Sequence, residues 1–189
     1  TGMTIPPSLT LRSLLSFAAH PYWSLHYLLD RDFELKNVAH RARAVAGRPL
    51  PLVEYIGSQF DRSLTWRDAE WLAGEWGGPL AIKGVLRADD VKLAASVGAS
   101  AVMLSNHGGR QLDSVPAPVE CVAPARDAVG DAVELIVDGG VRRGGDVLKA
   151  LALGANACSI GRPYLYGLAA AGEAGVAAVL AKFREEMER

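Results

Sequence analysis

The stretch that decides the fold is Ala101-Val102-Met103-Leu104-Ser105-Asn106-His107-Gly108-Gly109-Arg110-Gln111-Leu112-Asp113. Its first four residues are almost wholly apolar, which is typical of a strand buried on both faces of a parallel sheet. His107 and Arg110 would then follow the carboxyl end of that strand, where α/β proteins bind their ligands. A base and a guanidinium at this place predict chemistry on a small carboxylate. The same residues also fit a plain loop with a solvated arginine.

Outward from this stretch, residues 79–189 alternate apolar segments, glycine turns and alanine-rich segments. This alternation predicts βα units and a parallel sheet. The expected strands are Leu80–Lys83, Ala101–Ser105, Glu134–Asp138 and Ala157–Ile160, and the expected helices are Ala88–Val97, Pro118–Val129, Gly145–Leu153 and a last one from Tyr164.

An internal repeat supports this interpretation. The segment Gly84-Val85-Leu86-Arg87 is echoed by Gly140-Val141-Arg142-Arg143, and Gly98-Ala99-Ser100-Ala101 is echoed by Gly154-Ala155-Asn156-Ala157. Both echoes have the same offset, so two copies of a βαβα unit are expected. Two such copies make half of an eight-stranded (β/α)8 barrel.

Two loops after consecutive strands combine glycine with arginine. They are Asp138-Gly139-Gly140-Val141-Arg142 and Gly161-Arg162. Glycine lets the backbone approach a ligand and arginine binds anions, so the pair predicts the phosphate site typical of the last two strands of a (β/α)8 barrel. Lys83 ends a strand beside these loops, where its charge would stabilise the reduced ring of a phosphate-bearing redox cofactor. A lysine whose ammonium simply reaches water is the alternative explanation.

Residues 1–78 differ from the rest, because they hold all four tryptophans and no convincing parallel strand. We expect helices at Leu9–Ala19, Trp23–Leu29 and Leu35–Ala46, and a helix capped by Thr65 that runs to Trp76.

Composition excludes several classes of protein. Half of the residues are hydrophobic, 22% are charged and the net charge is −1, which indicates neither disorder nor nucleic-acid binding. Cys121 and Cys158 have no partners at metal-ligand spacing, so we expect small core residues in a reducing compartment and no metal site. The first residues resemble no signal peptide and no run is long enough to span a membrane, so we expect a cytoplasmic protein.

The motifs together resemble those of the FMN-dependent α-hydroxy-acid oxidases and dehydrogenases, which include glycolate oxidase, bacterial L-lactate dehydrogenase and mandelate dehydrogenase. The resemblance runs through residues 79–189 and is most specific at His107-Gly108-Gly109-Arg110-Gln111-Leu112-Asp113. It implies a TIM barrel of which residues 79–189 supply about the last four βα units. Residues 1–78 are similar to the helical segment that connects barrel strands 4 and 5 in bacterial members.

The resemblance also implies roles for individual residues. His107 matches the active-site base, which also contacts the substrate, and Arg110 matches the arginine that grips the substrate carboxylate. The residues that match FMN contacts are Lys83, Ser105, Asp138, Gly139, Gly140, Val141, Arg142, Gly161 and Arg162. The implied activity is FMN-dependent oxidation of a small L-2-hydroxy acid to the 2-oxo acid, with oxygen or a quinone as the electron acceptor.

Complete family members are much longer, and the counterpart of their first four strands is missing here. We therefore expect another segment or chain to supply the amino-terminal half of the barrel, a homo-oligomeric assembly, and little activity from residues 1–189 alone. Two alternatives remain open: a non-catalytic half-barrel that acts as a flavin-binding or assembly module, and another FMN-binding or phosphate-binding barrel enzyme. The second alternative leaves the pairing of His107 with Arg110 unexplained.

An apolar and aromatic region lies near the start of the chain. Its counterpart in bacterial family members is associated with membrane attachment, so the resemblance implies peripheral binding to the inner face of the plasma membrane, although packing against the barrel would explain the region as well. Its residues are Leu11, Leu14, Leu15, Phe17, Tyr22, Trp23, Leu25, Tyr27, Leu28 and Leu29.

Overall fold

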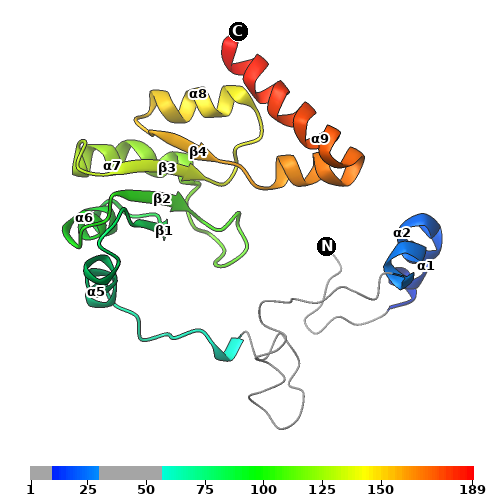
Figure 1. The fold of residues 1–189 in the computed structure, drawn as a ribbon, viewed down its shortest axis with the longest axis horizontal. Helices are drawn as coiled ribbons and strands as arrows, with labels where there is room; N and C mark the ends of the chain where they lie inside the picture. Colours follow the sequence, from blue (N-terminus) through cyan, green and yellow to red (C-terminus); the bar gives the residue numbers. More distant parts are fainter. Residues whose placement is uncertain (1–9, 30–56) are drawn as a thin grey trace. The chain divides into compact units, whose positions relative to one another are not determined.

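The computed structural model describes residues 10–29 and 57–189 (Figure 1). Two compact units divide the chain, Thr1–Arg62 and Ser63–Arg189, which we call the hairpin unit and the sheet unit. The expected segment 1–78 crosses this division, so its role as a connecting segment remains a prediction.

Residues 10–29 of the hairpin unit form a pair of helices, α1 (Leu11–Ala19) and α2 (Pro21–Leu29). A capping box opens α1, because the hydroxyl of Thr10 accepts a hydrogen bond from the Ser13 amide at 3.2 Å and the Ser13 hydroxyl accepts one from the Thr10 amide. Helix α2 begins at Pro21 rather than at the expected Trp23, since proline fits the first turn of a helix. The helix expected at Leu35–Ala46 lies outside the described residues.

Aromatic rings stack along one side of this hairpin. The ring of Trp23 lies 5.7 Å from that of Phe17 and 5.2 Å from that of Tyr27, centroid to centroid, with both pairs nearly parallel. The Ser24 hydroxyl donates a hydrogen bond to the carbonyl of Phe17 at 2.8 Å and so joins the two helices. Most of the apolar side chains nevertheless face solvent, and no residue of either helix is buried.

The sheet unit contains four parallel strands in the order β1-β2-β3-β4 (Figure 1). Their bounds are β1 (Ala81–Val85), β2 (Ala101–Ser105), β3 (Glu134–Asp138) and β4 (Ala157–Ser159). The predicted parallel sheet is thus confirmed, and β2 and β3 have the predicted bounds. Strand β1 extends to Val85, beyond the expected end at Lys83. Its pairing with β2 skips Gly84, and this irregularity uses a φ of 98°, which glycine adopts easily.

Helices connect successive strands, as a parallel sheet requires. They are α5 (Trp66–Trp76) ahead of the sheet, α6 (Ala88–Ser96), the 3₁₀ turn η1 (Pro118–Cys121), α7 (Val122–Val129), α8 (Gly144–Ala152) and α9 (Arg162–Glu188). The predicted helical segment Pro118–Val129 is helical throughout, but its first four residues form the 3₁₀ turn η1 rather than α-helix. Pro124 has no N–H to donate to the carbonyl of Glu120, so a 3₁₀ turn precedes the α-helix.

The core contains residues of the strands and of the helices α6, α7, α8 and α9. Burial is deepest on β2 and β3, where Val102, Leu104 and Leu135 are completely buried. Strands β1 and β4 are more exposed, since each pairs on one side only within the described part of the chain. The apolar run at 101–104 is therefore the centre of the sheet, as its composition predicted.

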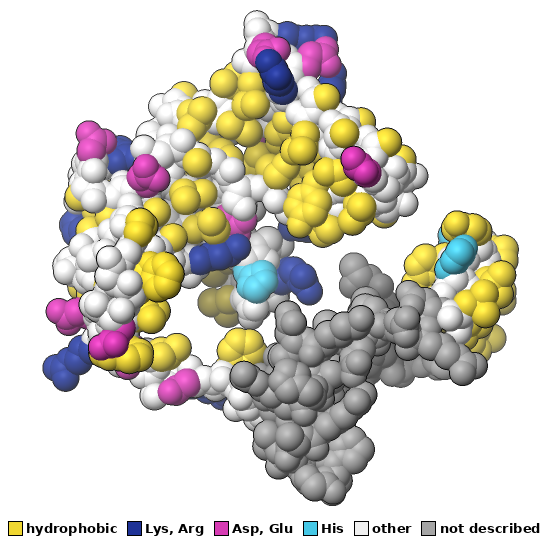
Figure 2. Space-filling model, viewed as in Figure 1, with side chains coloured by type: hydrophobic (Ala, Val, Ile, Leu, Met, Phe, Trp, Pro, Cys, Tyr) yellow, Lys and Arg dark blue, Asp and Glu magenta, His cyan; other side chains and the backbone are white. Residues whose placement is uncertain are grey.

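Large apolar side chains remain exposed over much of the sheet unit, and Figure 2 shows hydrophobic side chains gathered on the face in view. Such an extent of exposed apolar surface marks a contact surface. Those at least 40% exposed are Leu64, Trp71, Leu72, Trp76, Leu93, Leu112, Leu148, Leu151, Leu153, Leu165, Tyr166, Leu168 and Leu180.

Helix α9 is bent back on itself. Ala171 and Gly172 have non-helical backbone angles and separate an amino-terminal from a carboxyl-terminal arm. The arms cross where Gly167 meets Gly175, with no room for a Cβ on either residue. By length and composition α9 is the one described helix apolar enough to cross a membrane. Each arm is shorter than the roughly 20 residues that a span needs, so α9 is not a single transmembrane helix.

Candidate active site

A carboxylate lies at the carboxyl ends of the strands, and three polar side chains converge on it. It belongs to Asp138, the last residue of β3, whose Oδ2 accepts a hydrogen bond from the Ser105 hydroxyl at 2.5 Å. The Nζ of Lys83 lies 3.1 Å from the same oxygen. Ser159, the partner of Asp138 in the sheet register, lies beside this carboxylate and helps to lower its pKa. Each strand therefore contributes one side chain to what we call the Asp138 cluster.

The surroundings of Asp138 favour its ionised form. Burial acts to raise the pKa of the carboxyl group, because it removes water from the charge. Hydrogen bonds from Ser105, Lys83 and Ser159, with the positive charge of Lys83, outweigh burial and hold the pKa of Asp138 below its ordinary value. The cluster thus contains an ammonium–carboxylate pair at neutral pH.

The loop after β2 is tied to this cluster through a serine. The amide of His107 donates a hydrogen bond to the hydroxyl of Ser105 at 3.1 Å, and that hydroxyl in turn donates to Asp138. His107, Gly108 and Gly109 all have left-handed backbone angles, with φ of 57°, 66° and 72°. This conformation is easy for glycine and uncommon for histidine, so the two glycines allow the chain to turn and the contacts hold the histidine in place.

The side chains of His107 and Arg110 are exposed on this loop. Nε2 of Gln111 lies 3.3 Å from Nδ1 of His107, and Oδ1 of Asn106 accepts a hydrogen bond from the Gly109 amide at 3.2 Å. Figure 2 shows positively charged side chains gathered beside a histidine on this face. A titratable ring and a guanidinium therefore share one anchored turn, which suits carboxylate binding and proton transfer.

The loop after β3 approaches the loop after β2 very closely. Gly139 has a φ of 116°, and a Cβ at this position would lie 3.2 Å from Oδ1 of Asn106. Gly140 is also left-handed, and Arg142 is exposed. Val141, by contrast, has its side chain buried in the core, so only its backbone is available to a ligand.

The loop after β4 is joined to the loop after β2 by an arginine. Nη2 of Arg162 donates a hydrogen bond to the carbonyl of Gly108 at 2.8 Å. Gly161 and Arg162 lie at the start of α9, which begins two residues earlier than expected because Pro163 fits the first turn. The sequence-predicted residues of three loops are thus brought to one end of the sheet.

Sequence reasoning missed two residues of this site, Ser159 and Asn106. Ser159 is a polar residue in an otherwise apolar strand two positions before Gly161, and this pattern was the available signal. Asn106 lies inside the quoted motif, but its contact with Gly139 depends on the approach of two loops. Neither contact follows from spacing along the chain.

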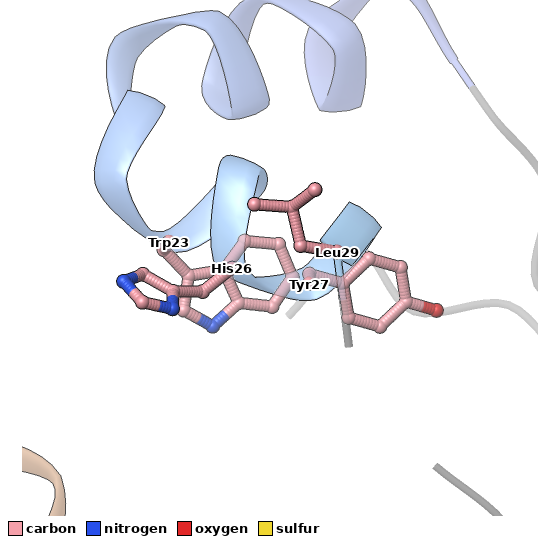
Figure 3. A pocket seen from close by; sticks show the side chains of 4 residues that line it. All are labelled: Trp23, His26, Tyr27 and Leu29. Atoms are coloured by element: carbon pink, nitrogen blue, oxygen red, sulfur yellow. The ribbon is translucent and has the colours of Figure 1, made fainter. Parts of the chain in front are cut away.

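A separate hollow lies on α2 and is lined by Trp23, His26, Tyr27 and Leu29 (Figure 3). None of the sequence-predicted site residues lines it. It is an open surface hollow among aromatic side chains, so we assign it to the apolar surface of the hairpin unit rather than to the Asp138 cluster.

The model of one protein family, described as FMN-dependent dehydrogenase, matches residues 1–189. The chain belongs to the FMN-dependent dehydrogenase family. FMN is therefore the cofactor of its family, as the resemblance implied, and the fold is of the same α/β class as that of its relatives.

Curated relatives in this family are bacterial L-lactate dehydrogenases. The one from Pseudomonas entomophila (strain L48) is 42% identical over 185 residues, which are 96% of this chain and 48% of that protein. The one from Vibrio cholerae serotype O1 (strain M66-2) is 40% identical over the same shares of the two chains. The chain thus spans about half the length of the curated relatives it matches.

Solved structures in this family give the same result. A monotopic membrane protein, (S)-mandelate dehydrogenase, has a TM-score of 0.85 and 38% identity, and the match covers 98% of this chain and 48% of that one. A flavocytochrome b2 variant with sulfite bound has a TM-score of 0.66 and 48% identity over 68% of this chain and 35% of that one. A mandelate oxidase variant with (S)-mandelic acid has a TM-score of 0.63 and 44% identity over 65% of this chain and 37% of that one.

The residues at the carboxyl end of the sheet fit a phosphate-bearing flavin. Glycines at 139, 140 and 161 leave backbone accessible, and the exposed guanidinium groups of Arg142 and Arg162 supply positive charge for a phosphate. The Asp138 cluster supplies both a donor and an acceptor for the polar parts of the cofactor. Nothing in this donor set conflicts with FMN.

Proposed function

We propose that this chain is the catalytic part of an FMN-dependent enzyme that oxidises a small L-2-hydroxy acid to the 2-oxo acid. In this proposal residues 79–189 are the last four βα units of a TIM barrel, and residues 1–78 connect them to strand 4. The observation that carries the proposal is the placement of His107 and Arg110 on one glycine turn anchored to the Asp138 cluster.

Arg110 would hold the substrate. A guanidinium binds a carboxylate through two parallel hydrogen bonds, which fixes orientation as well as position. With the carboxylate held, the α-carbon and its hydroxyl lie in one defined place, and orientation of this kind accounts for much of enzymatic rate enhancement.

His107 would act as the general base. Its imidazole would take one proton from the substrate, while the second hydrogen leaves with the electron pair, and the 2-oxo acid is the product. FMN, when bound, supplies the acceptor for these two electrons. The ammonium of Lys83, paired with Asp138, would stabilise negative charge on the reduced cofactor.

The remaining predicted cofactor residues would hold FMN without taking part in chemistry. Ser105, Asp138 and Gly139 would contact its polar chain, and the exposed guanidinium groups of Arg142 and Arg162 its phosphate. Gly140, Val141 and Gly161 would contribute backbone groups only.

The relatives named above are called lactate or mandelate enzymes, which supports a 2-hydroxy acid of this size as the substrate. We include glycolate in the proposed substrate class, with oxygen or a quinone as the final electron acceptor. The likeness to a monotopic membrane protein supports peripheral membrane attachment. We propose a cytoplasmic location at the membrane surface for the complete enzyme, which would be a homo-oligomer.

The test is His107→Gln in a complete barrel, meaning this chain together with the segment that carries the other strands. The variant should retain its yellow flavin but fail to bleach with any 2-hydroxy acid under anaerobic conditions, because loss of a general base costs about a hundredfold or more in rate. His26→Gln, on the hairpin unit, is the matched control and should bleach normally.

Normal bleaching by His107→Gln would refute the proposed mechanism. If the unaltered protein binds flavin but no 2-hydroxy acid bleaches it, the chain is a flavin-binding or assembly module instead. If the unaltered protein binds a phosphate-bearing ligand other than FMN, the chain belongs to a barrel enzyme with a different activity.

A further inference from the structure

The carboxyl-terminal arm of α9 docks on the first turn of α8. The amide of Gly144, the first residue of α8, donates a hydrogen bond to Oε2 of Glu186 at 2.8 Å, although the two residues are 42 positions apart. A Cβ on Gly144 would collide with the carbonyl of Phe183 and would lie 2.7 Å from the Cβ of Glu186. Only glycine permits this approach, so the contact is a specific fit between two elements.

The neighbouring amides are held by a second carboxylate. Oδ2 of Asp146 accepts hydrogen bonds from the amides of Arg142 at 3.0 Å and Arg143 at 3.1 Å. Three successive amides, at positions 142 to 144, are therefore satisfied by two carboxylates from two different helices. The first amides of a helix have no intrahelical partner, so these bonds replace water at the start of α8 and fix its direction.

Arg142 ends the loop that follows β3 and begins this held segment. The position of its guanidinium depends on how firmly the start of α8 is held, because a side chain is no better placed than its backbone. Phe183, one turn before Glu186, is only 8% exposed and belongs to the core, so it anchors the arm that carries the carboxylate.

We propose that Glu186 is a positioning residue for the phosphate site of FMN. It acts through the Gly144 amide on the loop that carries Arg142 and touches neither substrate nor cofactor. The inference rests on the proposed function, because it takes the glycine–arginine loops as the site of the phosphate. The hydrogen bond matters rather than the charge, since an anionic side chain beside an anionic ligand contributes nothing favourable by itself.

A role at the phosphate site predicts that loss of Glu186 affects the binding of FMN but not that of riboflavin. Riboflavin has the same ring and ribityl chain but no phosphate. In a complete barrel, Glu186→Ala should weaken FMN binding by at least about fivefold and leave riboflavin binding unchanged. Glu186→Gln keeps an acceptor oxygen and should bind FMN as the unaltered protein does. The matched control is Glu185→Ala, which removes an exposed carboxylate that pairs only with Lys182 and Arg189 among the described residues.

The measurement is the dissociation constant of each flavin from fluorescence quenching, with the melting temperature of each apoprotein alongside. An equal loss of FMN and riboflavin affinity in Glu186→Ala would show a merely structural role and overturn the proposal, as would unchanged FMN affinity. If the alanine variant does not fold, Glu186→Asp, whose shorter side chain falls short of Gly144, must show the same selective loss. An unaltered protein that binds neither flavin would instead refute the proposed function.

Discussion

At the scale of single residues, Asp138 is the centre of the candidate site. Its carboxylate interacts with the side chains of Lys83, Ser105 and Ser159. The Ser105 hydroxyl also accepts a hydrogen bond from the His107 amide. The serine hydroxyl both accepts and donates, so it couples the turn to the cluster. Loss of the carboxylate should therefore disturb both Lys83 and the turn that carries His107.

The first prediction concerns Asp138 and pH. Because the pKa of this carboxyl is lowered in the folded protein, its contribution to stability is present above the ordinary value of about 4 and is lost as pH falls through the lower folded value. In a complete barrel, Asp138→Asn should cost roughly 2 kcal/mol of unfolding free energy at pH 7. Urea unfolding from pH 7 to pH 3 measures this cost, which should shrink below about pH 4.

The control is Asp127→Asn, since Asp127 is exposed on α7. Its effect on unfolding should be small and should not depend on pH in this way. An Asp138→Asn variant as stable as the unaltered protein at pH 7 would contradict the assigned role.

A second prediction concerns Arg110. Replacement by Lys retains the positive charge but loses the guanidinium, which can donate two parallel hydrogen bonds to the two oxygens of a carboxylate. KM for the 2-hydroxy acid should therefore rise at least about tenfold, which corresponds to about 1.4 kcal/mol. Steady-state kinetics of the complete barrel measure it, and an unchanged KM would rule out the carboxylate clamp.

At the scale of elements, the α1–α2 hairpin is the feature that the candidate site leaves unexplained. Its apolar and aromatic side chains face solvent, with Leu11 75%, Tyr22 79% and Leu28 73% exposed. Trp and Tyr are favoured at the interface between lipid and water, and helices of nine residues are too short to cross a membrane. The (S)-mandelate dehydrogenase to which the chain is similar is described as a monotopic membrane protein.

The third prediction is that the hairpin carries the enzyme to the membrane. Leu25→Ser together with Leu28→Ser should shift a complete enzyme from the membrane fraction to the soluble fraction, since each loses about 1.5 kcal/mol or more of apolar burial. Flavin content and activity with a soluble electron acceptor should not change. Trp71→Ser with Leu72→Ser, exposed on α5 of the sheet unit, is the control pair. Equal recovery of all forms from the membrane would argue against attachment through α1 and α2.

At the scale of the whole molecule, the sheet is open at both sides among residues 10–29 and 57–189. Strands β1 and β4 each have one partner among the described strands, and a parallel strand is normally buried between two neighbours. The exposed apolar side chains of the sheet unit add to this surface. Four strands do not satisfy the geometry of a closed barrel, which requires strand number and shear to agree.

The last prediction follows from this open sheet. A polypeptide of residues 1–189 alone should aggregate or form a dimer that covers the strand edges, and it should turn over no 2-hydroxy acid at a useful rate. Light scattering after size-exclusion chromatography and a flavin absorbance spectrum measure both properties. Addition of the amino-terminal half, in the same chain or as a second one, should restore flavin binding and activity together. A monodisperse monomer with full FMN content and normal turnover would disprove the idea.

The sequence by itself determined the parallel sheet, the bounds of β2 and β3, and the loops that carry His107, Arg110 and Arg142, because strand burial and glycine turns are local properties of the chain. Only the tertiary structure decided which side chains meet. The convergence of Lys83, Ser105 and Ser159 on Asp138, and the contact of Glu186 with Gly144, join residues that are distant along the chain. Such contacts depend on strand register and on how two helices dock, and neither is encoded in the spacing of residues within one segment.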